Sequence, residues 1–363
     1  MSIDIIIVNF YSSLYVAQCL AQLGPWPHGV VWVVDNSDDA VEARQLHAIC
    51  SGLGAVRVMI APANLGFGRG CNLAFAQSKA DLVLLLNPDA RITPASIGIL
   101  ANALHGEQRW GAVSPRMYWN EARSFLLPLA SPQTPAASVT SALASYSRRG
   151  AQLLAERELQ RMQVQLHPSS PPFEVPMLAG AVLLLRRQSV LNAGGLFDPD
   201  YFMFFEDADL SLRLRRTGYA LALVPAASAE HEYRHKAFKA GMMAKSQHQY
   251  FSKQYPAFYR WSGGLSRVAA LARPIEIAKW FKVMPEPVAS AQEFAERTGN
   301  GRVLAFSPSV MMMPALFRPS FTDARCFDEQ EWALLEPASY SVLVQSTGQN
   351  RKPDWFYFER AKV

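Results

Sequence analysis

The chain has 363 residues, more than one compact core usually holds, so we expect one large domain with an appendage, or two domains. Hydrophobic residues make up 50% and charged residues 18%, which excludes a disordered chain. The net charge of +5 arises from 35 basic and 30 acidic residues, and this small excess does not indicate a nucleic-acid-binding protein. Anionic small molecules and a membrane surface remain as candidate partners. The four cysteines are widely spaced and no apolar run reaches the ~18 to 20 residues of a membrane span, so we expect a reduced, cytoplasmic protein.

Four short apolar runs near the N-terminus predict strands that are buried on both faces of a parallel sheet. Helix-length segments with apolar residues at helical spacing separate them. This order predicts a doubly wound, Rossmann-like three-layer α/β/α sandwich, in which ligands bind beyond the carboxyl ends of the strands. The predicted strands are 3–8, 30–34, 56–60 and 82–86, and the predicted helices are roughly 12–23, 39–51 and 68–79.

Polar side chains follow each of these four strands, and we expect them to converge on one rim of the sheet. They are Asn9 and Tyr11 after the first strand, Asp35 and Asn36 after the second, Asn64 after the third, and Asn87 and Asp89 after the fourth.

The composition changes to Pro, Ser and Ala from about 126 to 176, which predicts an insertion or a mobile flap, with one exposed helix at 147–165. The apolar run 181–185 then resumes the sheet. We expect residues 1–260 to form the main domain.

A basic, partly amphipathic helical segment at 261–284 either packs on its own domain or lies on an anionic membrane surface. Short β-like runs follow, at 302–306, 340–344 and 355–358. They predict a small β-rich C-terminal module over 285–363.

The strand-end residues suit the recognition of a nucleotide. Asp35 can accept a hydrogen bond from the imide N–H of uracil or thymine, or from ribose hydroxyls, and Tyr11 can stack on the base; an N-cap or an Asx turn is the structural alternative for Asp35. Asp89, in a turn shaped by Pro88, can hold Mg²⁺ or Mn²⁺ together with substrate phosphates, unless the turn is a plain β-turn.

A glycine-rich turn, Asn64 to Asn72, leads into a helix and includes Gly66 and Arg69. Backbone N–H groups in such a turn can approach an anion, although glycine-rich turns are common for structural reasons alone.

Three carboxylates, Glu206, Asp207 and Asp209, follow the aromatic stretch YFMFF and open a predicted helix that ends in arginines. Helix capping accounts for one or two of them. A carboxylate beside aromatic rings has a raised pKa and can serve as a general base, so we assign that role to Asp207 and an orienting role to Glu206. His231, after the predicted strand 220–225, can bind a metal or donate a proton to a diphosphate; a structural histidine is the alternative.

The ordered series IIIVNFYSS, VVDNSDD, NLGFGRGCNLAF, LLLNPDA, LAGAVLLLRR and GGLFDPDYFMFFEDADLSLRLRRTGY, with the later His231, resembles the bacterial rhamnosyltransferase-like branch of glycosyltransferase family 2, of GT-A fold, over about residues 3–255. The resemblance implies that Asp89 faces the metal, Asp207 is the catalytic base and His231 approaches the metal-diphosphate. It also places Asp35 and Asn36 in the nucleotide site, Gly180 near the transferred sugar, and Arg213 and Arg216 near the leaving-group arginine of some relatives. The chain departs from the family pattern at Arg69 and Cys71.

The resemblance therefore implies an inverting, metal-dependent glycosyltransferase. It would move rhamnose or a similar hexose from a dTDP- or UDP-sugar to a hydroxyl of a saccharide or lipid-linked oligosaccharide, in the biosynthesis of a cell-surface polysaccharide. We expect it in the cytoplasm, either free or at the inner face of the plasma membrane, with no nucleic-acid partner. The alternative is a catalytically silent nucleotide-sugar-binding or assembly protein of a polysaccharide complex.

Overall fold

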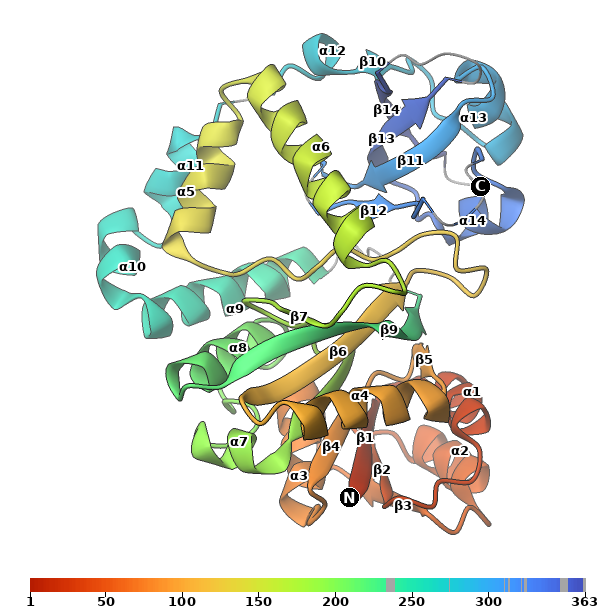
Figure 1. The fold of residues 1–363 in the computed structure, drawn as a ribbon, viewed down its shortest axis with the longest axis vertical. Coiled ribbons are helices and arrows are strands. Elements are labelled where there is room, and N and C mark those ends of the chain that lie inside the picture. Colours follow the sequence, from red (N-terminus) through yellow and green to blue (C-terminus); the bar gives the residue numbers. More distant parts are fainter. Residues whose placement is uncertain are drawn as a thin grey trace. The chain divides into compact units, whose positions relative to one another are not determined.

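The computed structural model describes residues 1–232, 239–273, 275–309, 311–312, 314–320, 322, 325–346 and 352–361. They fall into two compact units (Figure 1). The first contains residues 1–116, 168–231 and 239–260, and the second contains residue 232 and the described residues of 117–167 and 261–361. None of the described helices is long and apolar enough to cross a membrane.

The first unit is built on a nine-stranded sheet in the order β3-β2-β1-β4-β8-β6-β9-β5, with β7 paired to β9. Strands β1 to β4 are parallel, and β8 joins β4 in the antiparallel direction. The predicted strands are confirmed, but β3, at the edge of the sheet, is only partly buried and not buried on both faces as expected. Their bounds are Ile3–Asn9 (β1), Val31–Asp35 (β2), Val56–Ile60 (β3), Leu82–Leu86 (β4), Ala90–Ile92 (β5), Trp110–Tyr118 (β6), Phe173–Glu174 (β7), Val182–Arg186 (β8) and Ala220–His231 (β9).

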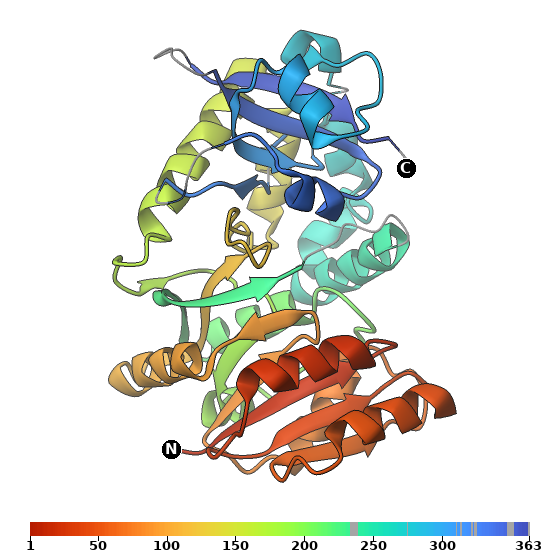
Figure 2. The same ribbon diagram turned by 90° about the vertical axis from the view of Figure 1, so that its right-hand side faces the viewer.

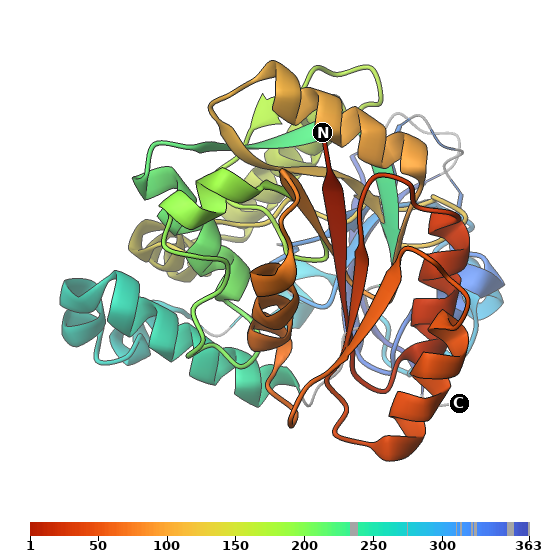
Figure 3. The same ribbon diagram turned by 90° about the horizontal axis from the view of Figure 1, so that it is seen from below.

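Helices cover both faces of this sheet. Helices α1 and α2 pack on each other, whereas α3 covers β1 and β2 from the opposite side (Figure 3). From β1 to β3 each new strand is added on one side of β1, and the chain then returns to add β4 on the other side. Because parallel crossovers are right-handed, this change of direction places the connecting helices on opposite faces of the sheet. The helices are Ser13–Leu23 (α1), Ala40–Cys50 (α2), Phe67–Gln77 (α3), Pro94–Gly106 (α4), Arg187–Asn192 (α7), Glu206–Arg216 (α8), Lys239–Gln254 (α9) and Pro256–Ser262 (α10).

The second unit contains a five-stranded sheet in the order β10-β14-β13-β11-β12, whose blue C-terminal strands lie side by side in Figure 2. Aromatic rings fill its core; Phe294, for example, lies 5.0 Å from Phe358 between ring centroids. The strands expected in the C-terminal module are β11, β13 and β14. The bounds are Lys282–Val283 (β10), Arg302–Ser307 (β11), Leu316–Phe317 (β12), Ser339–Gln345 (β13), Asp354–Glu359 (β14), Ala291–Arg297 (α13) and Glu329–Leu334 (α14).

The Pro- and Ser-rich stretch contributes to this second unit. It contains α5 (Pro135–Ala144) and α6 (Arg148–Gln165), and its first residues pair with the C-terminal sheet, since the Leu126 amide donates to the Phe317 carbonyl at 2.8 Å. The basic segment after residue 261 folds as two short helices, α11 (Ser266–Leu271) and α12 (Ile277–Trp280).

Candidate active site

The ends of β1 and β2 form a buried polar cluster around Asp35. Asn9 lies directly opposite Asp35 in the parallel ladder and donates its Nδ2 to Asp35 Oδ1 at 3.2 Å. The amide and hydroxyl of Ser37 donate to the same oxygen, at 3.1 and 2.7 Å. Within the part of the chain that the structure describes, these hydrogen bonds all reach Oδ1, so Oδ2 is the oxygen that a ligand donor can use.

Glu42, in the first turn of α2, supports this cluster. Its Oε1 accepts hydrogen bonds from Asn9 Nδ2 at 3.0 Å and from the Ser13 amide at 2.9 Å. These bonds orient the Asn9 amide, which in turn holds Asp35. Sequence reasoning missed Glu42 because an acid three residues after the N-cap Asp39 looks like an ordinary capping box.

Tyr11 lies beyond the end of β1 with its side chain 58% exposed, next to the exposed ring of Phe10. Its φ of 50° is unusual for a residue that is not glycine. An exposed ring next to the Asp35 cluster is suited to stacking on a base.

The glycine-rich turn is held by Asn36 and by the loop before α8. Asn36 Oδ1 accepts from the Leu65 amide at 2.9 Å, and Nδ2 donates to Asn64 Oδ1 and to the Gly66 carbonyl, both at 3.2 Å. Gly66 has a φ of +80°, and a Cβ there would lie 2.1 Å from the Phe202 carbonyl oxygen. The fold therefore requires glycine at position 66.

Arg69 also has a structural partner, because its Nε donates to the Pro199 carbonyl at 2.6 Å. The phosphate contacts expected of Asn64, Gly66 and Arg69 stay predictions.

Asp89 and His231 meet at the end of the short ladder between β5 and β9. The register pairs Ala90 with His231, and His231 Nε2 lies 3.2 Å from Asp89 Oδ1. Adjacent ligands of a six-coordinate Mg²⁺ lie about 3 Å apart, so this separation suits a divalent ion. The described residues contain no cluster of three or more His, Cys, Asp or Glu side chains that could hold a metal. Two protein ligands leave the other positions to phosphate oxygens and water.

Asp207 is connected to this end of the sheet through the start of β8. The Asn87 amide donates to the Ala181 carbonyl at 2.8 Å, and the neighbouring Gly180 amide donates to Asp207 Oδ2 at 3.2 Å. The Ala208 amide holds the other carboxylate oxygen of Asp207 at 2.8 Å. The side-chain Oδ1 of Asn87 is buried without a hydrogen-bond partner among the described residues, as a polar atom awaiting a ligand would be.

The two acids at the start of α8 differ in their surroundings. Glu206 is 7% exposed and its Oε2 is buried without a partner among the described residues, whereas Asp207 is half-buried. Burial, and then the charge of Asp207, raise the pKa of Glu206 to about 8. Burial also raises the pKa of Asp207, against the opposing effect of the Ala208 and Gly180 amides. Glu206 therefore holds a proton near neutral pH, which favours Asp207 as the base.

The turn that precedes these acids is strained. Phe204 and Phe205 have φ values of 69° and 67°, in the left-handed region. Such conformations cost about 1–3 kcal/mol each and are often found at functional sites.

Arg213, which the resemblance places near the leaving-group arginine of some relatives, has structural partners. Its Nε donates to Asp209 Oδ2 at 2.7 Å, its Nη1 donates to the carbonyls of Ala193 and Gly195 at 2.9 and 2.8 Å, and its Nη2 donates to the Leu196 carbonyl at 2.5 Å. Arg213 thus fastens the turn after α7 to helix α8. Arg216 binds the side chain of Gln254.

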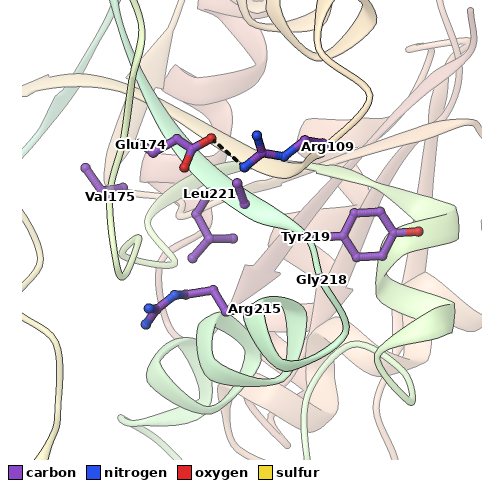
Figure 4. Close-up of a pocket in the computed structure, with 8 residues that line it drawn as sticks. Arg109, Glu174, Val175, Arg215, Gly218, Tyr219 and Leu221 are labelled. Carbon is purple, nitrogen blue, oxygen red and sulfur yellow. Dashed lines mark hydrogen bonds and ion pairs between the residues drawn. The ribbon is translucent and has the colours of Figure 1, made fainter.

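A polar cavity of about 230 Å³ lies elsewhere in the first unit (Figure 4). Arg109, Glu174 and Arg215 line it, with Arg109 paired to Glu174 at 3.3 Å. It adjoins Ala220 and Leu221 at the beginning of β9, whereas His231 is the last residue of that strand. This cavity is therefore separate from the acids described above.

Several known proteins are similar to this chain. An N-acetylglucosaminyl-diphospho-decaprenol L-rhamnosyltransferase of Mycobacterium tuberculosis is 32% identical over 197 residues, which are 51% of this chain and 61% of that relative. The chain therefore spans less than two thirds of that relative. Rhamnosyltransferase WbbL of Escherichia coli K12 is 27% identical over 64% of this chain and 83% of its own.

Among solved structures, GalNAc-T7 with UDP, GalNAc and Mn²⁺ has a TM-score of 0.52 at 12% identity, over 99% of this chain and 67% of its own, a likeness of fold alone. The sequence model described as "Glycosyltransferase like family 2" matches residues 2–250. The chain belongs to this family and has the α/β GT-A fold.

Proposed function

We propose that the protein is an inverting glycosyltransferase that transfers rhamnose or a similar hexose from a dTDP- or UDP-sugar. The observation that carries the proposal is the contact between His231 Nε2 and Asp89 Oδ1, which lie 3.2 Å apart at one end of the sheet. At the same end, the Gly180 amide donates a hydrogen bond to Asp207. Both curated relatives are named rhamnosyltransferases, which supports the choice of sugar.

The contacts of these residues support the following proposed roles. Asp35 Oδ2 accepts the imide N–H that uracil and thymine share, and Tyr11 stacks on the base. Asp89 and His231 hold Mg²⁺ or Mn²⁺, which supplies positive charge to the departing diphosphate when bound. Asp207 removes the proton of the acceptor hydroxyl, and a single in-line displacement inverts the anomeric centre.

The acceptor is a saccharide or a lipid-linked oligosaccharide on the route to a cell-surface polysaccharide. The name of the mycobacterial relative includes a lipid diphosphate, which supports the lipid-linked choice. We place the reaction in the cytoplasm, with the protein either free or at the inner face of the plasma membrane.

Calorimetry with UDP and dTDP, in Mn²⁺, Mg²⁺ or EDTA, tests the donor site. We expect binding that needs the metal, and the sugar nucleotide that binds best becomes the donor for turnover assays. Absence of nucleotide binding in every metal condition would refute the proposal.

Asp207→Asn separates an enzyme from a silent binding protein. We expect unchanged nucleotide affinity and a loss of about 10²–10⁴-fold in kcat, since general-base catalysis contributes that much. Asp81→Asn is the matched control, because Asp81 precedes β4 at the opposite end of the sheet and binds Ser2. Unchanged turnover in Asp207→Asn would remove Asp207 from the base role.

A further inference from the structure

The second unit has an exposed surface at the junction of α5 and α11, which pack together (Figure 1). The Arg273 amide donates to Ser145 Oγ at 2.7 Å, and the Arg273 guanidinium lies 4.5 Å from the centre of the Tyr146 ring. These contacts join the segments 143–149 and 261–273. We call their exposed large side chains the α5–α11 surface; they are Leu143, Tyr146, Arg148, Arg149, Trp261, Arg267, Leu271 and Arg273.

Large apolar and aromatic side chains on this surface are exposed to solvent. Leu143 is 55% exposed and Leu271 is 38% exposed, and each lies two residues before one partner of the Ser145–Arg273 hydrogen bond. Tyr146 is 47% exposed and Trp261 is 52% exposed. Tyrosine and tryptophan are the residues that collect where hydrocarbon meets water in membranes.

The two segments that form this surface carry charges of a single sign. Residues 143–149 and 261–273 contain four arginines and no acid, whereas the whole chain has a net charge of only +5. All four arginines are exposed. The next acid along the second segment, Glu276, is paired with Lys279 at 2.6 Å. A guanidinium binds phosphate oxygens in a bidentate manner, which a lysine cannot do.

We propose that the α5–α11 surface docks the protein on an anionic phospholipid bilayer. The arginines bind lipid phosphates while the two leucines and the aromatic rings enter the interfacial layer. The proposal rests on the lipid-linked acceptor of the proposed function, because docking would bring the enzyme to the layer that contains that acceptor. A sequence segment alone cannot show this surface, since half of it comes from the Pro- and Ser-rich stretch.

Co-sedimentation with vesicles tests the docking without any sugar donor. The full chain should bind vesicles of phosphatidylcholine and phosphatidylglycerol in equal parts, bind phosphatidylcholine alone weakly, and lose the difference at high salt. The double variant R149Q/R267Q should bind the anionic vesicles about 25-fold more weakly, at roughly fivefold for each arginine near an anionic surface. Neither arginine has a hydrogen bond or ion pair among the described residues, so the variant should fold.

The control variant R44Q/R302Q removes two exposed arginines, on α2 and β11, and should bind the vesicles like the wild type. Equal binding by R149Q/R267Q and the wild type, or equal binding to neutral and anionic vesicles, would overturn the proposal. Nucleotide calorimetry on the same proteins keeps the two hypotheses apart: loss of vesicle binding with intact nucleotide binding leaves the active site unaffected, and absent nucleotide binding refutes the proposed function alone.

Discussion

Glu206→Gln tests the distribution of charge between the two acids at the start of α8. Glu206 is 7% exposed, and its pKa rises from 4.5 to about 8 on folding. Between these two pH values the folded protein retains a proton that the unfolded chain has lost, so this group makes the protein less stable as the pH rises. The full pKa shift of Glu206 corresponds to at most about 5 kcal/mol of free energy of unfolding. This stability is lost between about pH 4.5 and about pH 8. Glutamine has nearly the same shape and no charge, so the variant should not suffer this loss.

Urea unfolding of both proteins at about pH 5 and about pH 9 measures the effect, because the difference between their two pH dependences isolates Glu206. The variant should lose several kcal/mol less stability than the wild type over this interval. Glu158→Gln is the control, since Glu158 is an exposed partner of Arg161 on α6. Turnover by Glu206→Gln should stay close to that of the wild type at neutral pH, in contrast to Asp207→Asn. Equal pH dependence in wild type and Glu206→Gln would show that Glu206 is not held protonated, and the assignment of the base would then lose its electrostatic support.

Two glycines and one acid give further predictions. A Cβ at Gly180 meets only ordinary contacts of 3.7 Å or more, so Gly180→Ala should keep its melting temperature and lose kcat/KM because the methyl group occupies the space assigned to the sugar; unchanged kcat/KM contradicts that assignment. Gly66→Ala should lower the free energy of unfolding by more than about 2 kcal/mol in urea titrations, because the methyl group clashes with Phe202 at a positive φ, and a smaller loss would mean that the turn can move. Glu42→Ala should weaken UDP binding about tenfold in calorimetry, because Asn9 loses one of two acceptors, whereas Glu42→Gln can keep an oxygen there; equal affinities would remove its positioning role.

Strands β1, β2 and β4 were predictable because they are largely buried on both faces. Ile5, Val33 and Leu84 are fully buried, and a strand in this position reads as a continuous apolar run. The end of β9 was not predictable, because the apolar run ends at Pro225. Proline has no N–H to donate to a neighbouring strand, so it normally marks the end of a strand. The strand nevertheless continues through Pro225 to His231.

The candidate site was predictable where a residue follows a buried strand or belongs to a dense motif. Asp35 and Asp89 are of the first kind and Asp207 is of the second. Glu42 and the structural role of Arg213 were not predictable, because each depends on a tertiary contact. The same holds for the second unit, where Leu126 pairs with Phe317 across nearly two hundred residues of sequence, as no local pattern can show.

The register of one short ladder decides whether the proposed metal site exists. Three residues of β5 pair with the last three of β9, and Ala90 opposite His231 brings the histidine next to Asp89. Side chains alternate between the two faces of a strand, so a slip by one residue would turn His231 to the other face and separate the two ligands. The buried side chain of Ile92 opposite Ala229 opposes such a slip, because it would have to leave the core. Packing at the inner end of the ladder thus holds the polar pair at its outer end, and the proposed site depends on an apolar residue of the core.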